Sequence, residues 1–102
     1  MQAQAEAVRL TFSLEARRDL AAIISHGERY FGIQTSRNYV AKLRNTLDLI
    51  GRNPMLAHER PEFGRPIRIH PVGAHVIVYE MADDVVKVVR ILPSQRNWAD
   101  HI

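Results

Sequence analysis

The sequence has 102 residues, of which 46% are hydrophobic, and this length is enough for one small domain with a single core. It contains no cysteine, which excludes a disulfide scaffold, an iron–sulfur site and a cysteine nucleophile. The formal net charge is +3, and twelve of the fourteen basic residues are arginine. Arginine suits contacts with carboxylates, phosphates and aromatic rings, but the codon bias of a GC-rich genome would produce the same excess. Composition therefore leaves the function open.

No targeting signal is visible at the N-terminus. The start MQAQAEAVRL lacks the basic region and the apolar stretch of a signal peptide, and no apolar run approaches the ~20 residues of a membrane span. We therefore expect a cytoplasmic protein without membrane association. We expect one domain over residues 1–102, with a flexible N-terminal tail at 1–6 and a polar C-terminal tail at 93–102.

The chain is predicted to begin with a strand and a helix. Residues 8–13 alternate between apolar and polar side chains, which is typical of a half-buried strand. Ser13 can then cap a helix whose first turn contains Glu15, because an acidic group is favourable at a helix N-terminus. Apolar residues recur at helical spacing up to Phe31, and Gly32 predicts the end of this helix.

A second helix is predicted to begin near Thr35 or Ser36 and to end at Asn53–Pro54. The short connection between the two helices predicts an antiparallel hairpin. The buried stripe of the second helix consists of Val40, Leu43, Leu47 and Ile50.

An irregular connection at 53–64 is predicted to lead into three short strands. These strands span residues 65–70, 74–81 and 85–92. Strict alternation in the last strand places Lys87 on one face, with Val89 and Ile91, and Arg90 on the other. The predicted fold class is α+β in the order β-α-α-β-β-β, with the helical hairpin packed on a small, mainly antiparallel sheet.

The order of these elements resembles the ParE branch of the RelE/ParE superfamily, the toxins of type II toxin–antitoxin systems. The segments that carry the resemblance are LTFSLEARRDLAAI, LDLIGRNPMLAHERPEFG, RPIRIHPVGAHVIVYEM and VVKVVRIL. The resemblance implies a RelE/ParE-like fold and a toxin that is not itself an enzyme. It further implies that the toxin inhibits growth by poisoning DNA gyrase and is neutralised by a ParD-like antitoxin in a hetero-oligomer.

The RelE branch of the same superfamily offers an alternative, a ribosome-dependent mRNA endoribonuclease. Such nucleases often have an arginine three residues before a strand tyrosine, but before Tyr79 that position holds Val76. Their lysine run before the last three strands has no counterpart, because residues 53–64 contain Arg60 as their one basic residue. Near the C-terminus, Trp98 has only an N–H donor and cannot act as a general base. These departures favour the ParE-like reading.

A third alternative is a non-toxic protein-interaction module of the same fold.

The five histidines show no paired spacing typical of metal ligands, so neither a metal site nor a cofactor is predicted. The basic residues are spread along the chain and form no single stripe, so we expect no direct sequence-specific binding of nucleic acid.

The C-terminal segment is the first candidate site. The resemblance implies that this segment acts on the toxin's target, and the residues singled out are Arg90, Ser94, Gln95, Arg96 and Trp98. The alternative is an ordinary solvated strand end.

A basic patch is the second candidate site. Arg65, Arg68, His70 and His75 are accompanied by no acid within residues 65–75. As an outward patch they would suit acidic side chains of the antitoxin. Phosphate binding is the less favoured alternative.

Apolar helix residues form the third candidate site. Leu14, Tyr30, Ile33 and Tyr39 do not all fit the two inward stripes, so apolar area is expected to stay exposed. Such an area could take the amphipathic segment of an antitoxin, and a free sheet edge at 66–70 would be a further docking point. Ordinary protein surface is the alternative.

Overall fold

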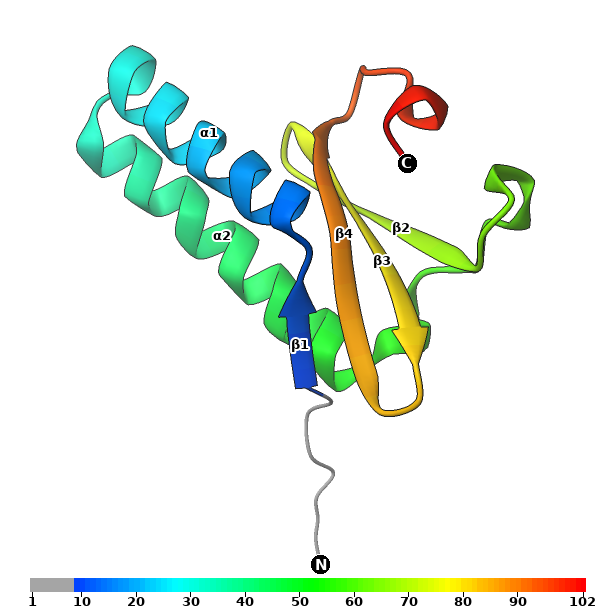
Figure 1. The fold of residues 1–102 in the computed structure, drawn as a ribbon. Coiled ribbons are helices and arrows are strands. Elements are labelled where there is room, and N and C mark those ends of the chain that lie inside the picture. Colours follow the sequence, from blue (N-terminus) through cyan, green and yellow to red (C-terminus); the bar gives the residue numbers. More distant parts are fainter. Residues whose placement is uncertain (1–8) are drawn as a thin grey trace, which may run out of the picture.

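A four-stranded mixed sheet is covered on one face by two antiparallel helices (Figure 1). The computed structural model describes residues 9–102. The strand order is β1-β4-β3-β2, in which β1 (Arg9–Phe12) runs parallel to β4 (Val85–Pro93). Strand β3 (His75–Ala82) pairs antiparallel with β4 and with β2 (Ile67–Val72). The predicted α+β fold class is therefore confirmed.

Two predictions fall outside the described residues. These are the flexible tail at 1–6 and the start of the first strand at Val8. Within residues 9–102, neither long helix is apolar enough to cross a membrane.

The first helix, α1 (Leu14–Phe31), begins as its sequence predicts. The Ser13 hydroxyl accepts a hydrogen bond from the Ala16 backbone N–H at 2.9 Å, and Glu15 lies in the first turn. Gly32 ends the helix with a φ of +90°, a conformation that favours glycine.

The second helix, α2 (Ile33–Arg52), begins two residues before the predicted start at Thr35. The cause is Gly32, which reverses the chain in one residue. Its carbonyl already accepts the Ser36 N–H at 3.0 Å, so Ile33 belongs to the first helical turn. The antiparallel hairpin is confirmed.

The two helices meet closely at Gly27. A Cβ atom at this position would lie 2.8 Å from the Ser36 hydroxyl oxygen, and Ser36 is buried. Glycine is therefore required here by the close approach of the two helices.

The substitution Gly27→Val is expected to force the helices apart and to lower the free energy of unfolding by about 1–3 kcal/mol, the usual cost of overpacking. Urea denaturation followed by circular dichroism would measure this loss. Ala22→Val, at an exposed position of the same helix, is the control and should cost less than about 1 kcal/mol. Equal stability of Gly27→Val and the wild type would contradict the close contact.

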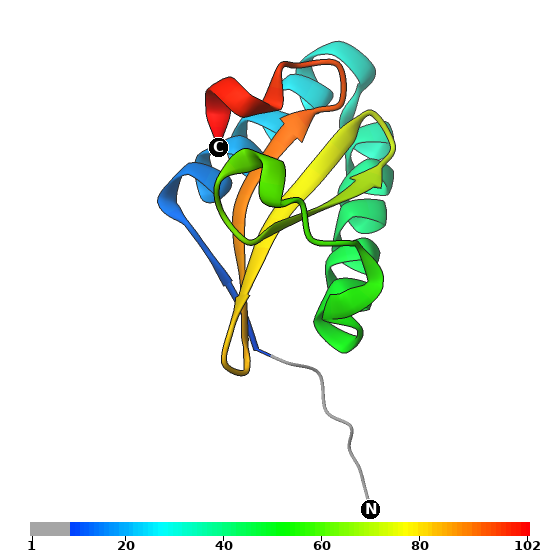
Figure 2. The ribbon, with the colours of Figure 1, turned by 90° about the vertical axis from the view of Figure 1, so that its right-hand side faces the viewer.

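The sheet has a buried core on each face. The core against the helices consists of Ala16, Leu43, Leu47, Ile50, Val72, Ile77, Tyr79, Val86, Val88 and Ile91. The core on the opposite face consists of Ile67, Ile69, Val76, Val78, Val89 and Leu92. Figure 2 shows that the connection before β2 and the C-terminal segment lie over this second face, whereas the helices lie behind the sheet.

A β-bulge in β4 overturns the alternation predicted for this strand. Val78 pairs with Arg90 but Tyr79 pairs with Val88, so Val89 is an extra residue in β4. Beyond the bulge the two faces are exchanged: Val88 and Ile91 both face the helices. The prediction that Ile91 shares a face with Val89 is therefore wrong, as is the placing of Arg90 on the face of Val88.

The β2 strand starts and ends two residues later than predicted. The turn to β3 is Gly73–Ala74, with Gly73 at a φ of +56°. The predicted free edge is also partly wrong, because the chain before β2 covers it. Glu59 forms a β-bridge with Arg68, and the Arg60 N–H donates to the Ile67 carbonyl at 2.6 Å.

The C-terminal segment is less polar in its contacts than its sequence predicts. It forms a short 3-10 helix, η3 (Trp98–His101), after β4. Trp98 and Ile102 pack against the second face of the sheet.

Candidate functional site

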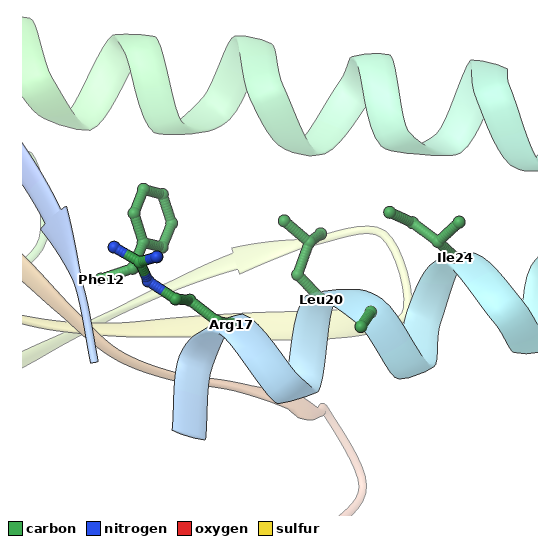
Figure 3. Close-up of a pocket in the computed structure, with 5 residues that line it drawn as sticks. Phe12, Arg17, Leu20 and Ile24 are labelled. Carbon is green, nitrogen blue, oxygen red and sulfur yellow. The ribbon is translucent and has the colours of Figure 1, made fainter. Parts of the chain in front are cut away.

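An apolar groove runs along α1 on the side that faces α2 (Figure 3). It has a volume of about 370 Å³ and is lined by Phe12, Arg17, Leu20, Ala21 and Ile24. The four α1 residues are spaced so that they share one helix face. Leu20 and Ile24 project from α1 towards α2, and Phe12 and Arg17 lie at the other end of the groove from Ile24. The groove is thus apolar along its length and basic at one end.

Apolar side chains extend the exposed surface at both ends of α1. Leu14 is 56% exposed at the start of the helix. Tyr30, Phe31 and Ile33 are 62%, 64% and 58% exposed at the turn between the helices. The prediction of exposed apolar area is confirmed for Leu14, Tyr30 and Ile33.

Tyr39, by contrast, is half-buried and holds the β2–β3 turn. Its hydroxyl oxygen lies 2.6 Å from His75 Nδ1, accepts the Ala74 N–H at 3.0 Å, and can donate to the Val72 carbonyl at 3.3 Å. A Cβ atom on Gly73 would lie 2.7 Å from the Tyr39 ring. The structure therefore brings two candidate residues, Tyr39 and His75, together in a contact that stabilises the turn.

Burial lowers the pKa of His75 from its ordinary value of 6.5, against a smaller raising effect of the Asp19 carboxylate. A depressed pKa means that the unfolded chain binds the proton more readily. We therefore expect the free energy of unfolding to fall as the pH is lowered through about 6.5 and further towards the depressed pKa of the folded protein. Urea denaturation between pH 8 and pH 5 would measure this loss.

Replacing His75 by glutamine is expected to reduce the pH dependence over this window. His58→Gln makes the same substitution at an exposed histidine and is the matched control. An unchanged slope in His75→Gln would show that another group titrates.

The basic patch is partly neutralised within the chain. Arg65 forms an ion pair with Glu80, and the distance from Arg65 Nε to Glu80 Oε2 is 2.8 Å. Glu80 lies on β3, where it pairs with Ile67 of the neighbouring strand β2. Arg68 donates to the Ala57 carbonyl at 2.6 Å. His70 Nδ1 lies 2.8 Å from the Pro71 carbonyl oxygen. The prediction of a basic patch without an acidic neighbour is therefore wrong, because the pairing of β2 with β3 brings Glu80 beside Arg65.

The five candidates in the C-terminal segment separate into two groups. Ser94, Gln95 and Arg96 are exposed. Arg90 and Trp98 are half-buried: Arg90 is ion-paired with Asp19, and Trp98 packs on the second face of the sheet. The exposed group is free for contact with another molecule.

Two of the positions compared with the nucleases, Tyr79 and Val76, are buried. Tyr79 is fully buried, and its hydroxyl donates to the Pro54 carbonyl at 2.7 Å. Burial also raises the pKa of Tyr79. Val76 is 3% exposed and belongs to the core of the second face. Neither side chain can reach a phosphate or a ribose hydroxyl in this conformation.

No group of three potential metal ligands comes together within residues 9–102. The groove itself was not among the predicted sites. The signal for it is the second apolar stripe of α1, in which Leu20, Ala21 and Ile24 follow Arg17 at spacings of three and four. Leu20 also packs against the core, whereas Ala21 is exposed.

The fold and the groove together define a small α+β domain of the RelE/ParE-like class, with an open surface along its helical hairpin. The chain belongs to the family described as the ParE toxin of type II toxin-antitoxin system, parDE, whose family model matches residues 10–98.

One curated protein and one solved structure are similar to this chain. The chain is 24% identical over 90 residues to Toxin ParE1 of Caulobacter vibrioides (strain ATCC 19089 / CIP 103742 / CB 15), covering 88% of this chain and 93% of that protein. It is similar in fold to a chain in the solved structure titled "Chromosomal ParDE TA system from P. aeruginosa", with a TM-score of 0.73 and 16% identity. That comparison covers 85% of this chain and 96% of the other.

Proposed function

We propose that this toxin inhibits growth by binding a type II topoisomerase, DNA gyrase, and that a ParD-like antitoxin neutralises it in a hetero-oligomer. The observation that carries the proposal is the open apolar groove along α1 in a chain of the ParE family. Because gyrase acts on the chromosome, this function places the toxin in the cytoplasm.

The groove suits an amphipathic segment of the antitoxin. Leu20, Ala21 and Ile24 offer apolar contact, and Arg17 can pair with a carboxylate at one end. Exposed Leu14 and Tyr30 would enlarge the contact beyond the groove. Arg68 and His70 of the basic patch are candidates for further polar contacts with the antitoxin. Tyr39 and His75 would contribute indirectly by holding the β2–β3 turn, and Arg65 through its ion pair with Glu80.

The exposed part of the C-terminal segment is the proposed contact with the target. Ser94 and Gln95 offer hydrogen bonds, and Arg96 offers a charged planar donor. Arg90 and Trp98 would hold this segment in place, Arg90 through its hydrogen bond to the His101 carbonyl and Trp98 through its packing on the sheet. The toxin would thus act by binding, without chemistry of its own.

The burial of Tyr79 and Val76 supports binding over the alternative of mRNA cleavage. The test is to add the purified toxin to a gyrase supercoiling reaction and, separately, to translating ribosomes. Inhibited gyrase with intact mRNA is the expected result. Cleaved mRNA with unaffected gyrase would establish the nuclease instead, and no effect in either reaction, together with normal growth, would indicate a non-toxic interaction module.

A further inference from the structure

Neither of the two α-helices α1 and α2 covers the second face of the sheet. Its buried apolar residues are covered instead by three partly buried side chains, Phe63, Trp98 and Ile102. Two of these belong to residues 94–102, which we call the strap. The strap therefore does the work of a second layer of helices, which a sheet with apolar residues on both faces would otherwise require.

The strap is held by few polar contacts. Among the described residues, one hydrogen bond ties residues 97–102 to the rest of the protein, from Arg90 Nη1 to the His101 carbonyl at 3.0 Å. The Arg60 guanidinium also lies over the Trp98 ring, 6.0 Å from its centroid. The Asn97 side chain bonds to Asp100 within the strap itself. The indole N–H of Trp98 is buried without a hydrogen-bond partner in the described residues, which makes the docked position less favourable.

Arg90 is itself anchored to α1. Its Nε and Nη2 donate to the two carboxylate oxygens of Asp19 at 2.8 and 2.9 Å, and both side chains are largely buried. The same carboxylate accepts the Ile91 N–H at 2.9 Å. This geometry uses all three nitrogens of the guanidinium: Nε and Nη2 donate to α1, and Nη1 donates to the strap.

We propose that Arg90 is a positioning residue that latches the strap, and that the strap can leave the second face of the sheet when this latch is broken. Asp19 lies between Arg17 and Leu20, which line the groove, so the latch connects the groove helix to the C-terminal segment. The proposal concerns the chain alone and stands whether or not gyrase is the target.

Trp98 is the single tryptophan, so its fluorescence reports the position of the strap directly. In Arg90→Lys the ammonium can still pair with Asp19 but lacks the fork that reaches His101 at the same time. We expect the ratio of docked to released strap to fall by about tenfold or more, as loss of a hydrogen bond from a charged donor predicts. Acrylamide quenching of Trp98 and amide exchange in residues 97–102 should both rise, with unchanged far-ultraviolet circular dichroism.

Two further variants test the latch without touching the ion pair. Deleting residues 101–102 removes the carbonyl acceptor and should release Trp98, whereas Ile102→Ala keeps this acceptor and should release it much less. Arg65→Lys changes another half-buried, ion-paired arginine of the molecule and should leave Trp98 as in the wild type.

Three results would overturn the proposal. The first is unchanged quenching in both Arg90→Lys and the deletion variant. The second is equal release in Ile102→Ala and the deletion variant, which would show that apolar packing alone holds the strap. The third is release of Trp98 in Arg65→Lys, which would indicate a general loosening of the sheet.

Discussion

The substitution Ala21→Glu is expected to weaken binding of a ParD-like antitoxin by on the order of 100-fold, as expected for a charge placed at a desolvated contact centre. Ala21 is exposed in the free toxin and lines the groove, so a carboxylate there is tolerated until an apolar segment covers it. The affinity can be measured by titration calorimetry with the purified antitoxin. In cells, the antitoxin should no longer rescue growth.

The adjacent residue provides a matched control. Ala22 is also exposed on α1 but does not line the groove. Ala22→Glu makes the same change in charge and helix composition, and we expect antitoxin affinity within about threefold of the wild type, the range of ordinary surface substitutions. Equal weakening by both variants would point to net charge, and no weakening by Ala21→Glu would place the antitoxin elsewhere.

The substitution Arg96→Glu is expected to raise the toxin concentration needed for half-inhibition of gyrase by about tenfold or more, because it replaces a charged donor by a repelling group at the proposed contact. Arg96 is exposed, and the bond recorded at this residue is from its backbone N–H to the Pro93 carbonyl. The fold and the strap should therefore persist. A supercoiling assay measures the effect directly.

Arg44→Glu is the control for the reversal of charge. Arg44 is exposed on α2, away from the C-terminal segment, so inhibition should remain close to that of the wild type. If Arg96→Glu inhibits gyrase as strongly as the wild type, the proposal that the C-terminal segment contacts the target is wrong. Equal loss in both variants would indicate long-range electrostatic attraction to the target instead.

Most elements of the fold could be predicted because their signals are local. Ser13 and Gly32 mark the ends of α1 through a side-chain cap and a positive φ, both of which depend on neighbouring residues. The helical stripes and the near-continuous apolar strands indicate which segments must be covered. Errors at the start of α2 and in β2 amount to two residues at each boundary.

The details of the candidate sites depend on contacts between distant parts of the chain. The bulge at Val89 exchanges the faces of β4, and periodicity in one strand cannot reveal an extra residue relative to its partner. Glu80 neutralises Arg65 only because strand pairing brings the two together. The groove likewise requires Phe12 of β1 beside the stripe of α1.

The sequence by itself determined the α+β class, the helical hairpin and, through the order of its segments, the resemblance to ParE toxins. These features follow from local conformational preferences and from periodic apolar patterns. The tertiary structure alone decided that Arg90 links Asp19 to His101 and that Trp98 covers the second face of the sheet. Asp19 and Arg90 lie on different elements far apart in the chain, and burial of apolar surface brings their side chains into contact.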